Sequence, residues 1–60
     1  MRYRIFCSDE EGHDFFYCKT EDSANVLFNM AVQSKFYNYV ELEVITEGFS
    51  TIREWSEEDG

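Results

Sequence analysis

Hydrophobic and polar residues alternate at the start of the chain. Over residues 2–8, one face of an extended segment carries Tyr3, Ile5 and Cys7, and the other carries Arg2, Arg4 and Phe6. This period of two predicts a β-strand. Residues 15–19 are rich in aromatic side chains, which favour the pleated conformation, and predict a second strand.

A polar run containing Gly12 separates these two segments and is typical of a hairpin turn. If Glu11-Gly12 forms a two-residue turn, Cys7 lies opposite Phe16 and Ile5 lies opposite Cys18. The hairpin would then present these four residues to the core.

Residues 20–35 have the pattern of an amphipathic helix. Thr20 is expected to cap its N-terminus, and two acidic residues in the first turn, Glu21 and Asp22, suit the helix dipole. Apolar residues recur at helical spacing and predict a core-facing stripe of Ala24, Leu27, Phe28 and Ala31. Asn25, Asn29 and Gln33 mark the opposite face. Val26 and Met30 widen the apolar arc, and residues 23–34 carry no charge.

From Asn38 the period returns to two. Val40, Leu42 and Val44 alternate with Tyr39, Glu41, Glu43 and Ile45, which predicts a half-buried strand. Glu47-Gly48 indicates a second hairpin turn, and residues 49–55 predict a weaker edge strand. Its Trp55 either closes the core, the commoner role of a lone Trp in so small a domain, or anchors a partner.

Together these elements predict one α+β domain over residues 1–55. It is a small two-layer ββαββ domain, with an antiparallel sheet and one helix packed on one face. Residues 56–60 are expected to form a frayed acidic tail. The pattern does not fix the order of the strands.

The number of aromatic residues changes this picture. The chain has 60 residues and includes six Phe, four Tyr and one Trp. A domain of this size has one small core, so several of these large side chains should lie on the surface.

The sheet face away from the helix is the expected place for them. It should display aromatic and charged residues together, a combination typical of interaction surfaces. We therefore predict a partner-binding surface that also uses the uncharged helix, formed by Phe6, Phe15, Tyr17, Tyr39, Glu41, Glu43 and Met30. Homodimerisation through the sheet face is one form of this interface.

The net charge of −8 narrows the class of partner. Phosphate contacts need basic surfaces, so direct binding to nucleic acid or to an anionic membrane is not expected. The acids form clusters at residues 9–14, at the helix start, at Glu41 and Glu43, and at residues 54–59. They either solubilise the domain, which is the commoner role of such clusters, or imitate the phosphates of DNA for a basic protein partner.

The sequence offers little for catalysis. His13 is the one histidine, and no nucleophile–base set or phosphate-binding glycine loop is present, so we expect no enzyme activity. Cys7, His13 and Cys18 lack zinc-site spacing, and neither a metal nor another cofactor is expected. No signal peptide or membrane span is evident, which favours a cytoplasmic location with two free thiols; a disulfide would need the two cysteines directly opposite one another.

In size, charge and element order, the chain resembles the small acidic proteins with which bacteriophages inhibit host RNA polymerase or uracil-DNA glycosylase. The resemblance rests on no motif and assigns no site residue. It implies an inhibitor of a basic, nucleic-acid-handling host protein. The alternative is a structural homodimeric subunit that uses the exposed aromatic sheet face. Single-stranded RNA binding through the sheet aromatics is the weakest hypothesis because of the net charge.

Overall fold

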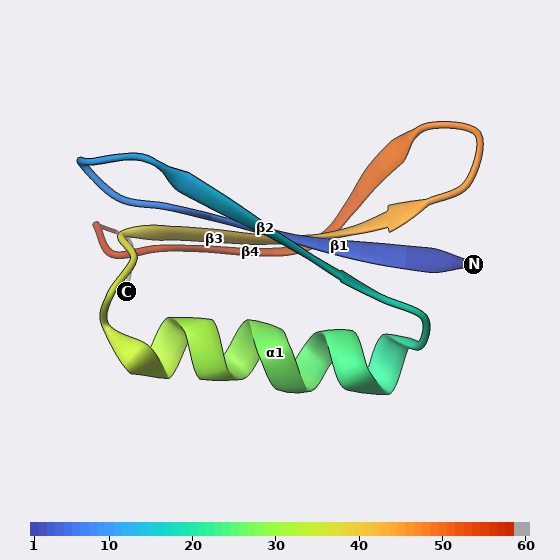
Figure 1. Ribbon diagram of the computed structural model, residues 1–60, viewed down its shortest axis with the longest axis horizontal. Coiled ribbons are helices and arrows are strands. Elements are labelled where there is room, and N and C mark those ends of the chain that lie inside the picture. The colour runs from blue at the N-terminus through green and yellow to red at the C-terminus, as the bar shows by residue number, and fades with distance from the viewer. Residues whose placement is uncertain (59–60) are drawn as a thin grey trace.

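The computed structural model describes residues 1–58 and confirms the predicted ββαββ order (Figure 1). The elements are β1 (Arg2–Ser8), β2 (His13–Cys18), α1 (Glu21–Ser34), β3 (Tyr39–Ile45) and β4 (Phe49–Ser56). All strand pairs are antiparallel, and the sheet order is β2-β1-β3-β4. β2 and β4 therefore form the two edges of the sheet, and β1 and β3 lie at its centre.

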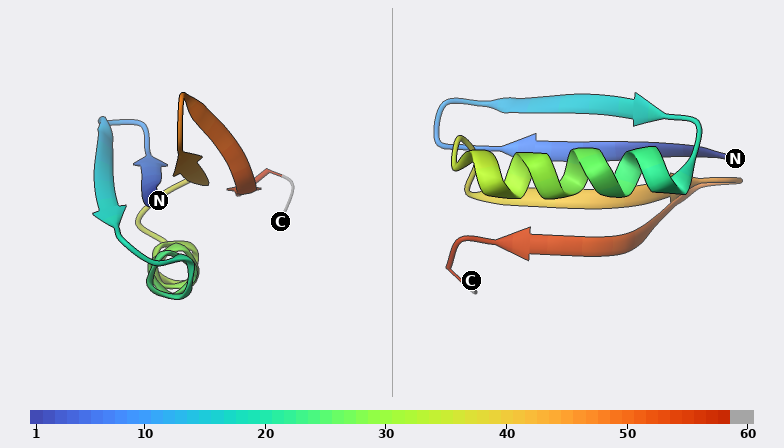
Figure 2. Two further views of the ribbon diagram at one scale, coloured as in Figure 1. Left: turned by 90° about the vertical axis from the view of Figure 1, so that its right-hand side faces the viewer. Right: turned by 90° about the horizontal axis from the view of Figure 1, so that it is seen from below.

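The helix covers one face of the sheet and lies mainly along β1 and β3 (Figure 2). The buried core comes from alternate positions of those strands and from the predicted helical stripe: Tyr3, Ile5, Cys7, Ala24, Phe28, Val40 and Leu42. Leu27, Ala31 and Trp55 are partly buried against this core. The alternation of residues in β1 and β3, and the helical spacing of apolar residues in α1, thus identified the core faces of these three elements.

The ends of the helix follow from local chemistry. The Thr20 Oγ1 accepts a hydrogen bond from the backbone N–H of Ser23 at 3.2 Å, which confirms the predicted cap. The helix ends at Lys35, whose left-handed backbone (φ 63°) turns the chain away from the helix.

The predicted register of the first hairpin is wrong. The structure pairs Ile5 with Phe16, Tyr3 with Cys18, and Cys7 with Asp14. The cause is Asp9, whose carboxylate accepts hydrogen bonds from the backbone N–H groups of Glu11 (2.8 Å) and Gly12 (2.9 Å). This side chain stabilises a turn over residues 9–12 in place of the two-residue turn, and Gly12 does not adopt a positive φ there.

The position of β2 at the sheet edge has consequences for the residues predicted to lie in the core. Phe16 does face the helix side, but 42% of its surface is exposed because β2 is an edge strand. Cys18 is only partly buried. Cys7 and Cys18 are not opposite one another, and both thiols are free.

The second hairpin contains a β-bulge. The pairing shifts between Leu42 and Glu43, leaving Ile52 as the extra residue of β4. β4 includes Ser56, and the Glu57 N–H donates to the Asn38 carbonyl at 2.9 Å. Of the predicted tail, residues 59–60 lie outside the described residues. Within residues 1–58, no helix is long and apolar enough to cross a membrane.

Candidate functional site

The sheet face away from the helix carries an aromatic cluster formed by Phe6, His13, Phe15 and Tyr39. The ring centroids of Phe6 lie 5.7 Å from His13, 5.2 Å from Phe15 and 6.1 Å from Tyr39. His13 and Phe15 are also in edge contact at 5.2 Å. Such tilted and edge arrangements are the favoured geometries of aromatic pairs, so the cluster is a packed surface layer rather than a set of isolated side chains.

Arg4 extends this layer toward the other end of the sheet. Its guanidinium carbon lies 4.9 Å from the Phe15 ring centroid and 3.9 Å from that of Phe49. The same group forms an ion pair with Glu43 at 2.9 Å. Burial lowers the pKa of Arg4, but its hydrogen bond and charge interaction with Glu43 outweigh this effect and raise the pKa above its ordinary value. Arg4 is therefore held as a fixed cation within the face.

This ion pair changes the role of Glu43. The residue lies on the predicted face, but only 6% of it is exposed. Its carboxylate is already paired with Arg4. Glu43 therefore supports the face from within and is not presented to a partner.

The structure brings together most of the predicted site residues. Strand alternation places six of the seven on this outer face: Phe6, Phe15, Tyr17, Tyr39, Glu41 and Glu43. Phe15 and Tyr17 are well exposed, whereas Glu41 is half-buried and accepts a hydrogen bond from the Thr51 hydroxyl. Met30 is exposed, but it lies on α1 in the other layer, away from this surface.

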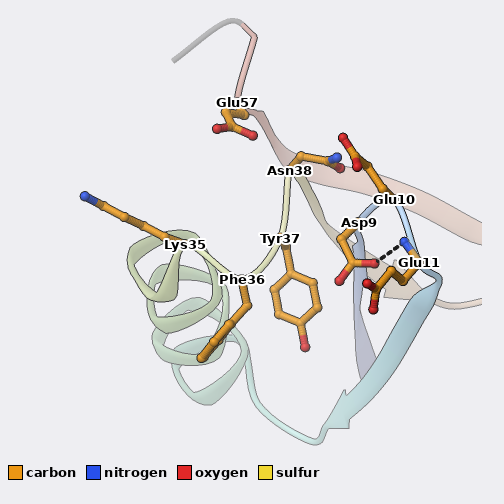
Figure 3. Close-up of a pocket in the computed structure, with 8 residues that line it drawn as sticks. All are labelled: Asp9, Glu10, Glu11, Lys35, Phe36, Tyr37, Asn38 and Glu57. Carbon is orange, nitrogen blue, oxygen red and sulfur yellow. Dashed lines mark hydrogen bonds between the residues drawn. The ribbon is translucent and has the colours of Figure 1, made fainter.

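A second feature lies at the end of the molecule that contains the β1–β2 turn. Here the turn, the loop after α1 and the chain after β4 meet around a cavity of about 330 Å³ (Figure 3). Four acidic residues line it together with one lysine and three other residues: Asp9, Glu10, Glu11, Glu57, Lys35, Phe36, Tyr37 and Asn38. Figure 3 shows the Lys35 side chain pointing away from these acids. We call Asp9, Glu10, Glu11, Glu57 and Glu58 the acidic end.

Backbone hydrogen bonds hold this end together. The Asn38 N–H donates to the Ser8 carbonyl at 3.0 Å, and the Asn38 carbonyl accepts from Glu57. The Tyr37 hydroxyl donates to the Asp14 carboxylate at 2.9 Å. This hydrogen bond, with burial, raises the pKa of Tyr37 to about 12, so the hydroxyl stays protonated at neutral pH.

Tyr39 connects the aromatic cluster to the acidic end. Its ring contacts Phe6, and it also lines a cavity of about 440 Å³ together with Glu10, Glu57 and Glu58. Its hydroxyl donates to the Glu54 carboxylate at 3.4 Å. Burial, and then the negative charges of Glu41 and Glu54, raise the pKa of Tyr39. The two features therefore form one continuous surface of aromatic rings bordered by carboxylates.

Sequence reasoning treated the acids of residues 9–14 and 54–59 as separate clusters. The sheet order places Asp9–Glu11 beside the described acids Glu57 and Glu58, since the end of β1 pairs with the start of β3, and the start of β3 pairs with the end of β4. The sequence pattern does not fix the strand order β2-β1-β3-β4, and without that order the proximity of the two clusters could not be predicted.

Among residues 1–58, no group of three or more His, Cys, Asp or Glu side chains could hold a metal ion. Cys7 is fully buried, and burial raises the pKa of its thiol to about 11, which makes it a poor nucleophile.

No family model, curated protein or solved structure matches the chain. The functional argument therefore depends on the geometry of the aromatic and acidic surface.

Proposed function

We propose that this domain is a non-catalytic protein-binding module that recognises a basic segment of a protein partner. The observation that carries the proposal is the continuity, through Tyr39, between the aromatic cluster and the acidic end. Aromatic residues dominate the energetic centres of protein interfaces, whereas carboxylates around them attract and orient a basic partner.

The chemistry of the surface suits arginine and lysine side chains. A cation can stack on an aromatic ring while a neighbouring carboxylate accepts its hydrogen bonds. The domain itself contains this combination, because Arg4 lies between two phenylalanine rings and pairs with Glu43. A partner cation at Tyr39 would find an aromatic ring beside Glu10 and Glu57.

The narrower hypothesis is that the domain inhibits a nucleic-acid-handling protein by imitating DNA. The exposed carboxylates of the acidic end support it, because they project from two chain segments, the β1–β2 turn and the chain after β4. Glu41 and Glu43 on β3 do not, since Glu43 is buried and Glu41 is half-buried. Competition by duplex DNA for a purified partner would test this version.

A structural homodimer is the second candidate. The exposure of Phe15 (42%), Tyr17 (56%) and Phe49 (54%) on one sheet face favours it, because burying these rings would stabilise a dimer. Each copy carries a net charge of −8, so two copies repel one another over a shared face. We therefore rank it below a basic partner.

A comparison of two variants as baits tests the main proposal. Tyr39→Ser removes the ring that joins the two features, and Val26→Ser makes a similar change at an exposed position of α1. Thermal unfolding should first show that both variants fold. We expect wild type and Val26→Ser to retain the same protein from a lysate, Tyr39→Ser to lose it, and about 0.5 M salt to release it. Equal retention by both variants would contradict the proposal.

A further inference from the structure

The edge strand β2 has features that suit the addition of another strand. Among the described residues, β2 pairs only with β1, so its other side is open. Natural sheet edges are commonly protected by bulges, prolines or charges. β4 has a bulge, but β2 pairs regularly with β1, and the chain contains no proline.

The register shows which backbone groups face outward. The Asp9 N–H donates to the Gly12 carbonyl, and antiparallel pairs alternate between bonded and non-bonded positions. Asp14, Phe16 and Cys18 therefore direct their N–H and C=O groups toward β1. His13, Phe15 and Tyr17 direct theirs away from the sheet, where an added strand could bond to them.

An apolar cavity lies beside this edge on the helix side. It has a volume of about 190 Å³ and is lined mainly by Phe16, Leu27, Met30, Ala31 and Phe36. This is too small for a typical small-molecule ligand but suits one aliphatic or aromatic side chain. Strand addition needs such pockets, because alternate side chains of the added strand point to each face of the sheet.

The charges around the edge select the occupant. The Asp9–Glu11 turn and Asp14 lie at one end of β2; Lys19 and then the two acids Glu21 and Asp22 follow its other end, so acids are in excess at both ends. A second copy paired antiparallel along β2 would bring these acids near one another, which is unfavourable. A segment with basic residues at both ends and apolar residues at its centre would be complementary.

We propose that β2 binds an extended, basic-flanked segment of a partner protein as a fifth strand, with one apolar side chain in the cavity beside Met30. This surface shares the Asp9–Glu11 turn with the acidic end but does not include Tyr39. In this proposal Met30, which does not lie on the outer sheet face, contacts the partner through the cavity beside β2.

The test uses a fluorescein-labelled peptide of nine residues. Its centre alternates apolar residues with threonine, and each end carries two basic residues; a control peptide carries glutamates at the ends. Tyr17→Pro removes an outward N–H without removing a bond to β1, whereas Tyr17→Ala removes the same side chain and keeps the N–H. Fluorescence anisotropy measures the affinities.

We expect the basic peptide to bind Tyr17→Pro about tenfold more weakly than Tyr17→Ala, because one backbone hydrogen bond is lost and its acceptor is left unpaired. The acidic peptide should bind wild type at least about tenfold more weakly than the basic one. Tyr39→Ser should bind the basic peptide as wild type does, so failure here is distinguishable from failure of the proposed function.

Hydrogen exchange gives a measurement that does not rely on folding of the proline variant. In wild type, the basic peptide should slow exchange at the amides of Phe15 and Tyr17. Equal affinities of the Pro and Ala variants, unchanged exchange, or no binding of the basic peptide would overturn the proposal. A wild-type dimer in sedimentation that Tyr17→Pro dissociates would show that the occupant is a second copy and would also overturn it.

Discussion

At the scale of single residues, Arg4 has the most consequential environment on the outer sheet face. It contacts the Phe15 and Phe49 rings and pairs with the buried Glu43. A carboxylate with so little exposed surface requires a cationic partner, because an unpaired buried charge is strongly unfavourable. The hydrophobic pattern alone could not reveal this, since it assigned Glu43 to the exposed face.

Replacing Arg4 by methionine should therefore destabilise the domain. Arg4→Met leaves Glu43 without a cation and should lower the free energy of unfolding by about 1–3 kcal/mol. The double variant Arg4→Met/Glu43→Met should return to within about 1 kcal/mol of wild type, because neither charge then remains. Urea unfolding measures both, with Arg2→Met as a control at an exposed position. A single variant as stable as wild type would show that the pair contributes nothing.

Tyr37 gives a prediction about alkaline pH. Its pKa is about 12 in the folded domain, compared with 10.0 ordinarily, chiefly because its hydroxyl donates to Asp14. Between these values the unfolded chain loses the proton while the folded domain keeps it. The free energy of unfolding contributed by this group is therefore complete below pH 10 and is lost as the pH rises toward 12.

The variant Tyr37→Phe should reduce this dependence. Urea unfolding at a series of pH values from 8 to 12 should give a shallower loss of stability than in wild type. Raised pKa values at Cys7 and Tyr39 account for part of the remaining slope. At neutral pH, the variant should be less stable by about 0.5–1.5 kcal/mol, the usual contribution of one hydrogen bond. A slope equal to that of wild type would refute the assignment.

At the scale of elements, periodicity predicted β1, α1 and β3, because each has one face in contact with the core. The edge strands β2 and β4, which are mostly exposed, were predicted from aromatic content and turn signals. The helix cap at Thr20 and the core stripe containing Phe28 were also predictable, since they depend on residues close in sequence. The register of the first hairpin was not. It depends on the Asp9 side chain and its bonds to the turn, which shift the pairing by two residues from the one expected for a two-residue turn.

The exposure of β2 has a different origin, the strand order. Phe16 lies on the core side of the sheet, yet its position in an edge strand leaves it beside the apolar cavity rather than under the helix. Edge or central position is a property of the strand order, which local periodicity does not contain. The site residues on the outer face could be predicted from the alternation of residues along the strands. The cavity beside Met30 could not, because its lining residues come from β2, α1 and the loop after α1, whose arrangement depends on the fold.

At the scale of the whole molecule, the fold places the acidic residues of the turns at two opposite ends. The β1–β2 turn and the chain after β4 bring one group together beside Tyr39, and Glu47 lies in the β3–β4 turn at the opposite end (Figure 1). The net charge of −8 attracts basic partners in general. The position of the carboxylates beside aromatic rings is what should make the attraction specific.

Charge reversal at each end tests this central claim most directly. Glu10→Lys and Glu47→Lys are the same substitution at exposed turn positions and change the net charge equally. The measurement is the affinity of each variant for the protein retained by wild type. We predict that Glu47→Lys binds within about twofold of wild type and that Glu10→Lys binds about tenfold more weakly. Equal losses in the two variants would show that only the total charge matters and would contradict a specific site at Tyr39 and the acidic end.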